Sequence, residues 1–272
     1  MLTISRTIIE HRELIWALAW KNIIVRYKQA YLGLGWAVLR PLMLVLVFTL
    51  IKTFVGIDSG GIPYPVLTFA ALMPWVLFQD ATSEGVSSIV ANANLIRKIY
   101  LPHEIFPLTA VFTRLIEFGI TLVIFSAMML YYTVTPTLHM LWAPFIILYV
   151  LAASLAVCFA GSAINVYFRD VSALLPMALS LLMYISPVIY PLSLVKQKLL
   201  EEHIMGEWSS ILYTIYITNP LAGIIDSFQR VMLLGVPPDL STLLPGVMLT
   251  TIALPLSYML FRSAQAYFAD VV

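Results

Sequence analysis

Charged residues and cysteine are scarce in this sequence, and both shortages narrow the class of protein. Only 11% of its 272 residues are charged, while 61% are hydrophobic; ordinary soluble domains carry about 25% charged residues. One cysteine excludes an internal disulfide framework, and four scattered histidines give no metal-ligand spacing. The net charge of +1 gives no reason to expect a nucleic-acid partner. The composition is that of an integral membrane protein forming one bundle-sized unit.

Motifs that carry catalysis are missing as well. The dipeptide Gly-Lys, which closes a phosphate-binding loop, occurs nowhere, so the chain cannot hydrolyse ATP by that route. There is no Gly-x-Ser-x-Gly elbow and no His-Glu-x-x-His pair, and paired carboxylates are confined to Glu201 and Glu202. We therefore expect a subunit that is not an enzyme, with no catalytic residue, no metal and no cofactor of its own.

Long apolar runs predict the fold class. A helix needs about twenty apolar residues to cross a hydrocarbon layer about 30 Å thick. Six segments qualify, at residues 33–56, 64–86, 105–132, 141–167, 174–191 and 240–262. The predicted fold is an all-α integral membrane protein with six transmembrane helices.

Basic residues set the orientation, because cytoplasmic loops are enriched in Lys and Arg. Nine lie on the side of the N-terminus, and these are Arg6, Arg12, Lys21, Arg26, Lys28, Arg97, Lys98, Arg169 and Arg262. Four lie on the other side, and these are Lys52, Lys196, Lys198 and Arg230. This bias predicts that both termini are cytoplasmic.

Residues 1–32 are too polar to span but carry an aromatic-rich stripe that includes Trp16, Trp20 and Tyr27, with Lys21 and Lys28 on another side. An amphipathic helix with basic flanks is typical of the cytoplasmic membrane surface. The alternative is a soluble helix packed on the bundle.

Residues 192–239, here called the gate region, form a long external connection that contains its own apolar runs. The run "SSILYTIYIT" is too short to cross and is followed by Asn219-Pro220, a turn signal. The run "LAGIIDSFQRVMLLG" predicts an amphipathic helix closed by Gly235. Two short re-entrant helices fit this pattern, and a helical hairpin lying on the bundle is the alternative.

Arg114 and Glu117 are ionisable residues inside a predicted span, where charge is costly. Their three-residue spacing places them on one helical face. We expect a structural ion pair facing the bundle interior. A proton relay is the alternative, although no chain of further carboxylates or histidines is evident around this pair in the sequence.

Six motifs resemble, in order, those of permeases of type-2 ABC exporters for bacterial surface polysaccharides. They are "RYKQAYLGLGWAVLRPL" at 26–42, "LMPWVLFQDA" at 72–81, "NANLIRKIYLPHEIFPL" at 92–108, "YFRDV" at 167–171, "SPVIYP" at 186–191 and "NPLAGIIDSFQRVML" at 219–233. The sequence departs from the family pattern at two positions. Members often carry arginine at the position of His103. In many members arginine directly follows phenylalanine, whereas here Gln229 stands between the two.

The resemblance implies a permease domain at residues 33–272 that forms a homodimer and assembles with two copies of a separate ATP-binding subunit, which would hold ATP and Mg. The cargo would be a lipid-linked polysaccharide, such as O antigen, capsule or teichoic acid, leaving through the bacterial cytoplasmic (inner) membrane. The gate region would cap the exit.

The resemblance also implies that residues 91–104, here called the coupling loop, dock on the ATPase through a short helix ended by Pro102. The residues assigned to this contact are Asn92, Asn94, Leu95, Ile96, Arg97, Lys98, Ile99 and Tyr100. Ile96, Ile99 and Tyr100 would bury against the partner, while Arg97 and Lys98 would reach carboxylates. An ordinary basic loop accounts for the two charges but not for the apolar residues beside them.

Family members are expected to line the transport path with aromatic rings, which contact the apolar face of a sugar without requiring fixed hydrogen bonds. The candidates are Tyr31, Trp36, Phe48, Trp75, Phe78, Tyr184 and Tyr190. The aromatic belts at both membrane interfaces are a competing explanation.

Two rival functions remain open at the level of the sequence. One is an export permease of the same architecture that carries a drug or a simple lipid. The other is a proton-driven secondary transporter that uses Arg114 and Glu117.

Overall fold

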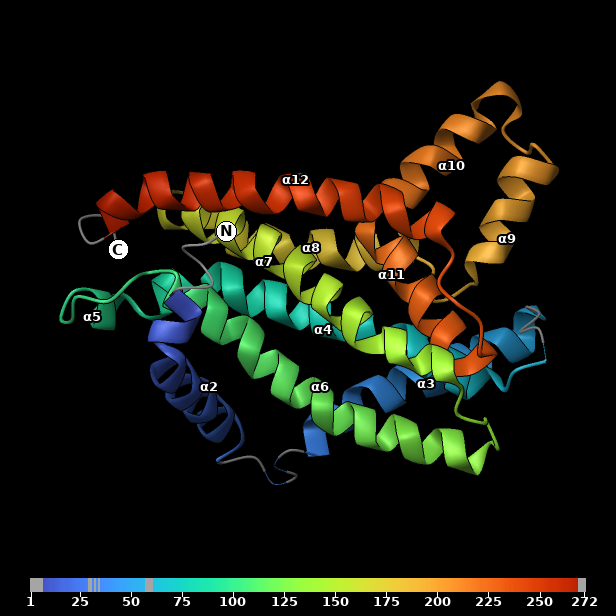
Figure 1. Ribbon diagram of the computed structural model, residues 1–272, viewed down its shortest axis with the longest axis horizontal. Coiled ribbons are helices and arrows are strands. Elements are labelled where there is room, and N and C mark those ends of the chain that lie inside the picture. The colour runs from blue at the N-terminus through green and yellow to red at the C-terminus, as the bar shows by residue number, and fades with distance from the viewer. Residues whose placement is uncertain (1–6, 29–30, 32, 34, 57–60, 269–272) are drawn as a thin grey trace.

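The computed structural model describes residues 7–28, 31, 33, 35–56 and 61–268, and within these ranges the regular structure is entirely helical. One long helix corresponds to each predicted span (Figure 1). These helices are α3 (Gly35–Val55), α4 (Tyr64–Ala91), α6 (Ile105–Tyr131), α7 (Ala143–Tyr167), α8 (Asp170–Ile185) and α12 (Leu240–Ala264). Two predictions fall outside the described residues, those for Arg6 and for the side chain of Lys52.

Three helical stretches are long and apolar enough to cross a membrane by length and composition, namely Ile105–Tyr131, Leu138–Tyr167 and Leu240–Tyr267. Two shorter stretches, Val38–Ile51 and Asp170–Ile185, are apolar as well. The chain is therefore a helical membrane protein, and the full count of six spans stays a prediction. Helix α8 ends six residues earlier than expected, because Ser186 precedes Pro187 and is held in an extended conformation with ψ 156°.

Helix α4 is the central element of the core and packs against α6 and α7. Aromatic rings fill the space around it: Phe69 of α4 stacks on Phe125 of α6 at 5.9 Å between ring centroids. Small residues bring α4 and α7 close together, since a Cβ on Gly85 would lie 2.2 Å from Cys158 Sγ. This packing fixes the face that α4 presents to α2, α3 and α6.

The two ends of the bundle differ. Helix α5 (Ala93–Ile96), in the coupling loop, lies at the same end as the C-terminal part of α12 (Figure 1). Helices α9 (Leu192–Lys196) and α10 (Ser209–Thr218) lie at the opposite end. Helices that cross a membrane in alternating directions would place their successive connections at opposite ends in this way.

Helix α2 (Arg12–Tyr27) is the described part of the predicted N-terminal amphipathic helix and packs against α6. Ile15, Ala19 and Ile23 are buried in this contact. The indoles of Trp16 and Trp20 stack on the exposed face with their centroids 6.4 Å apart. The helix thus packs on the bundle while keeping an aromatic outer face, and its position relative to a membrane stays a prediction.

The gate region contains two kinds of helix. Helices α9 and α10 extend away from the bundle in Figure 1, whereas α11 (Pro220–Gln229) packs against α4, α7 and α12. The predicted helix end at Gly235 is confirmed, since a π-helical turn (Arg230–Leu234) follows α11 and Gly235 adopts the left-handed conformation with φ +64°. Asn219 begins α11 by accepting a hydrogen bond from the Leu221 N–H at 3.1 Å.

Candidate functional site

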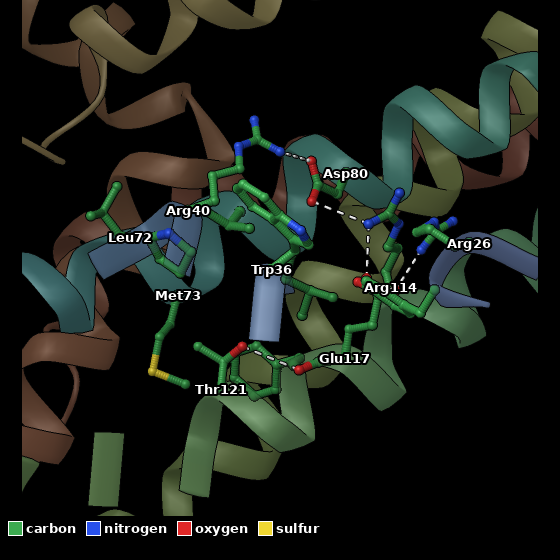
Figure 2. A pocket seen from close by; sticks show the side chains of 14 residues that line it. Arg26, Trp36, Arg40, Leu72, Met73, Asp80, Arg114, Glu117 and Thr121 are labelled. Atoms are coloured by element: carbon green, nitrogen blue, oxygen red, sulfur yellow. Dashed lines mark hydrogen bonds and ion pairs between the residues drawn. The ribbon is translucent and has the colours of Figure 1, made fainter. Parts of the chain in front are cut away.

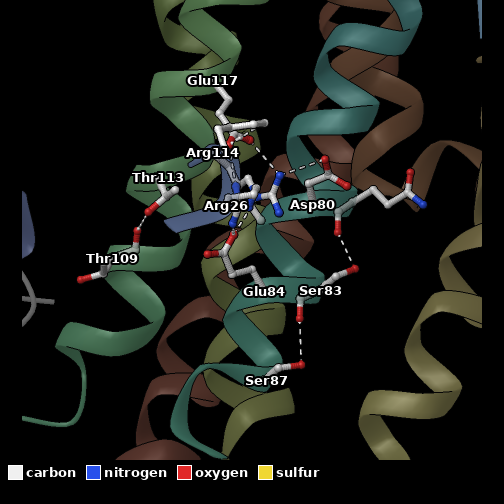
Figure 3. Close-up of polar contacts among 12 residues, drawn as sticks. Arg26, Asp80, Ser83, Glu84, Ser87, Thr109, Thr113, Arg114 and Glu117 are labelled. Carbon is white, nitrogen blue, oxygen red and sulfur yellow. Dashed lines mark hydrogen bonds and ion pairs between the residues drawn. The ribbon is translucent and has the colours of Figure 1, made fainter. Parts of the chain in front are cut away.

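Five ionisable side chains from three helices meet between α2, α4 and α6, and together they form what we call the charged cluster (Figure 3). Its members are Arg26 of α2, Asp80 and Glu84 of α4, and Arg114 and Glu117 of α6. Four-residue spacing on α4 and three-residue spacing on α6 place the members of each pair on one helical face. The packing of α4 against α6 then brings the two faces together.

Arg114 is the centre of the charged cluster. Its guanidinium lies 2.7 Å from Glu84 Oε2, 2.8 Å from Glu117 Oε2 and 3.3 Å from Asp80 Oδ2. Its side chain is only 17% exposed, and that of Glu117 is 9% exposed. Buried charges of this kind are tolerated because each one is paired and hydrogen-bonded.

Arg26 ties α2 to the same carboxylates. It donates to Glu84 Oε2 at 2.7 Å and to Glu117 Oε1, and the Tyr27 hydroxyl donates to Glu117 Oε1 at 3.1 Å. Burial, reinforced by the Glu117 carboxylate, raises the pKa of Tyr27. Tyr27 therefore stays a neutral donor, and α2 is attached to the bundle by charge as well as by packing.

The expectation that no further carboxylates extend the pair of Arg114 and Glu117 is wrong. Asp80 and Glu84 extend the pair. Each of these carboxylates, however, contacts an arginine, and they do not form a line of carboxylates running across the bundle. Two acidic residues four apart inside a predicted span were the signal that could have revealed them. Arg26 carried no such signal, because it reaches the cluster from a separate helix.

A pocket of about 290 Å³ opens beside the charged cluster, between α3, α4 and α6 (Figure 2). Arg40 of α3 lines this pocket and pairs with Asp80 Oδ1 at 3.0 Å. Leu72 and Met73 line an apolar wall, and the half-exposed indole of Trp36 lies near Arg40. The pocket therefore offers an aromatic face, ion-paired polar groups and an apolar surface together.

The aromatic candidates for the transport path separate into two groups. Trp75, Phe78 and Phe48 are buried in the chain's own hydrophobic core. Tyr31, Trp36 and Tyr184 are exposed. Tyr190 is partly exposed, and its hydroxyl lies within hydrogen-bond distance of the backbone carbonyls of Tyr184 and Ile185. Only the second group can touch a sugar without repacking the core.

Some residues of the coupling loop pack against the rest of the chain, and others are exposed. Helix α5 is one turn long and ends at Ile96 rather than near Pro102, and the Lys98 N–H bonds the Leu95 carbonyl in the turn that follows. Ile96 is buried against the chain's own core, and Asn92 donates to the Ser88 carbonyl at 2.8 Å. Asn94 and the run from Arg97 to Tyr100 are exposed, whereas Leu95 is half-buried. The exposed run presents two cations, Ile99 and a fully exposed Tyr100 at the end of the bundle.

Comparison with known proteins gives a consistent set of relatives. The profile of the family described as ABC-2 type transporter matches residues 13–233. An O-antigen export system permease protein RfbA from Myxococcus xanthus is 27% identical, with 100% of both chains covered. A protein of the same name from Klebsiella pneumoniae is 26% identical over 93% of this chain and 92% of its own. The polysialic acid transport protein KpsM of Escherichia coli is 24% identical over 92% of each.

Proposed function

This chain belongs to the ABC-2 type transporter family, and we propose that it is the membrane permease of an exporter that carries a lipid-linked polysaccharide out through the bacterial inner membrane. The observation that carries the proposal is similarity over the full length to a permease named for O-antigen export. The apolar helices support it, and the absence of a Gly-Lys phosphate loop from the sequence fits a permease whose energy comes from a separate ATP-binding subunit.

The permease would act as a homodimer with two copies of that ATP-binding subunit, which would bind ATP and Mg. Both termini and the coupling loop would face the cytoplasm, and the gate region would face outward. The bias of basic residues supports this orientation. The position of α5 and of α9 and α10 at opposite ends of the bundle supports it as well.

The exposed part of the coupling loop is the proposed contact with the ATPase. Arg97 and Lys98 are cations that can pair with carboxylates of the partner. Ile99 and Tyr100 have exposed apolar surface, and a partner that covers it removes that surface from water. Ile96 keeps a different part in this scheme, because it is buried in the chain's own core and anchors the loop.

The proposed cargo path uses exposed aromatic rings as sugar platforms. Trp36, Tyr31 and Tyr184 are accessible for this role. Trp36 also lines the pocket beside the charged cluster, where Arg40 and Asp80 offer hydrogen-bonding groups for sugar hydroxyls. A polysaccharide cargo is favoured over a drug or a simple lipid, because three relatives are named for export or transport of such glycans.

Charge reversal in the coupling loop tests the assignment. We expect Arg97→Glu combined with Lys98→Glu to leave the permease folded and inserted, and to abolish co-purification of the ATP-binding subunit, because acidic side chains would repel the carboxylates of the partner. The matched control reverses Lys196 and Lys198 at the opposite end of the bundle, where co-purification should persist. Normal co-purification with the loop variant would remove the coupling loop from the interface.

A further inference from the structure

Glu104 is a charged residue in the coupling loop that is almost completely buried, with a side chain only 2% exposed. Its Oε1 atom accepts hydrogen bonds from the Tyr258 hydroxyl at 3.0 Å and from Arg262 Nη1 at 3.0 Å. Both donors belong to α12, far away in the sequence. A buried carboxylate held by two donors on one helix fixes the position of the loop relative to that helix.

Apolar packing around Glu104 connects the same two elements. Ile96 and Phe106 lie in one buried cluster with Tyr258, Phe261 and Phe268. The ring of His103 contacts the ring of Phe268 with 5.6 Å between centroids. Burial lowers the pKa of His103, so this ring packs in its neutral form near neutral pH. The coupling loop is therefore joined to the cytoplasmic end of α12 by polar and apolar contacts alike.

Helix α12 runs along the whole bundle, and its other end packs against α10 and α11 of the gate region (Figure 1). The contact with α11 is close. A Cβ added to Gly223 of α11 would lie 2.7 Å from the Thr242 carbonyl oxygen, and one on Gly246 of α12 would lie 2.8 Å from Pro220 Cα. Backbones packed at this distance cannot slide independently. A displacement of the part of α12 around Gly246 would therefore be passed to α11.

We propose that Glu104, Tyr258 and Arg262 form a joint that carries ATP-driven movement of the coupling loop through α12 to the external helices α10 and α11. The three side chains act as positioning residues and touch neither cargo nor nucleotide. The inference rests on the proposed function, because it requires an ATPase bound at the coupling loop. In this proposal, movement of the coupling loop reaches the external helices through α12 and not through α4 and α6, the helices that flank the loop in sequence.

Tyr258→Phe is the sharpest variant, because it removes one hydroxyl and leaves the ring in the buried cluster. Glu104→Gln removes the charge and is the second variant. Tyr267→Phe is the matched control, since Tyr267 is exposed at the same end of α12. The permease is purified with its ATP-binding subunit, and three quantities are measured: co-purified subunit, ATP hydrolysis and glycan exported per ATP hydrolysed.

We expect both joint variants to keep normal co-purification and hydrolysis while glycan exported per ATP falls about fivefold or more, the lower range of typical coupling between sites. The Tyr267 control should match the wild type. Unchanged export per ATP in Tyr258→Phe would overturn the proposal. Loss of co-purification in that variant would overturn it too, because the joint would then only shape the docking surface.

A direct reporter of movement comes from Leu212→Cys on the exposed face of α10, since Cys158 is buried and does not compete for labelling. In the wild-type background we expect ATP to change the rate of labelling by a membrane-impermeant maleimide, and in Tyr258→Phe we expect no ATP-dependent change. An equal response in both backgrounds would contradict the proposal. Failure of the unmutated chain to bind any ATPase would instead refute the proposed function, so the two failures are distinguishable.

Discussion

At the scale of single residues, Arg114 is the side chain on which the charged cluster depends, because it contacts three carboxylates from two helices. Replacement by methionine keeps most of the side-chain length but leaves these carboxylates with too few cations. We expect Arg114→Met to destabilise the protein by about 3 kcal/mol, the usual cost of leaving buried charges unpaired. Thermal unfolding in detergent measures this loss.

The matched control for Arg114 is Arg12→Met on the exposed start of α2, where a surface substitution should change stability by no more than about 0.5 kcal/mol. Equal effects of the two substitutions would show that the charged cluster contributes no special stability.

Asp226 of α11 gives the gate region a dependence on pH. Burial raises its pKa to about 6, although Arg230 opposes the shift. Because the folded protein binds this proton more tightly than the unfolded chain, the stabilising contribution is complete below about pH 4 and is lost as pH rises through about 6. Asp226→Asn removes this dependence, so we expect it to raise the unfolding midpoint more at about pH 7.5 than at about pH 4.5.

Glu207→Gln is the control for Asp226, since Glu207 is exposed in the same region. It should shift the midpoint equally at both pH values. An Asp226 variant that stays parallel to the wild type at both pH values would be inconsistent with a buried, titrating Asp226.

At the scale of elements, the end of the π-helical turn that follows α11 depends on Gly235, whose φ of +64° other residues adopt at a cost of about 1–2 kcal/mol. A Cβ there would also lie 2.7 Å from Thr137 Cγ2. We expect Gly235→Ala to lower the free energy of unfolding by at least that amount.

Gly119→Ala is the control. Gly119 lies on an exposed part of α6, with no atom within 4 Å of the added Cβ. The substitution should therefore stabilise the helix by up to about 1 kcal/mol. A stability change of the same sign in both variants would exclude the left-handed cap as the cause.

The helices were largely predictable from sequence, and their contacts were not. Apolar runs located the long helices, and Asn219-Pro220 and Gly235 marked the ends of the gate-region helix, because these signals are local. The coupling helix proved shorter than its proline suggested. Glu117 was predictable as a partner of Arg114 from its three-residue spacing, whereas Asp80, Glu84 and the partners of Glu104 lie on helices distant in sequence. The spacing of Asp80 and Glu84 places both on one face of α4 but does not say which helix they contact, so these contacts are known only from the packed bundle.

At the scale of the whole molecule, the two ends of the bundle have different chemistry. One end presents the exposed cations and apolar residues of the coupling loop, and the opposite end presents α9 and α10. Between them, the charged cluster joins α2, α4 and α6, Arg40 of α3 pairs with its member Asp80, and α12 runs from end to end. This organisation suits a subunit that receives mechanical work at one end and opens a path at the other.

Transport of a lipid-linked polysaccharide by the permease in proteoliposomes, with and without its ATP-binding subunit, tests the central claim most directly. We predict translocation only when that subunit and ATP are both present, and no translocation under a pH gradient alone, because the chain has no phosphate loop and its cluster carboxylates are paired with arginines. Translocation driven by a pH gradient without the ATP-binding subunit would contradict the account.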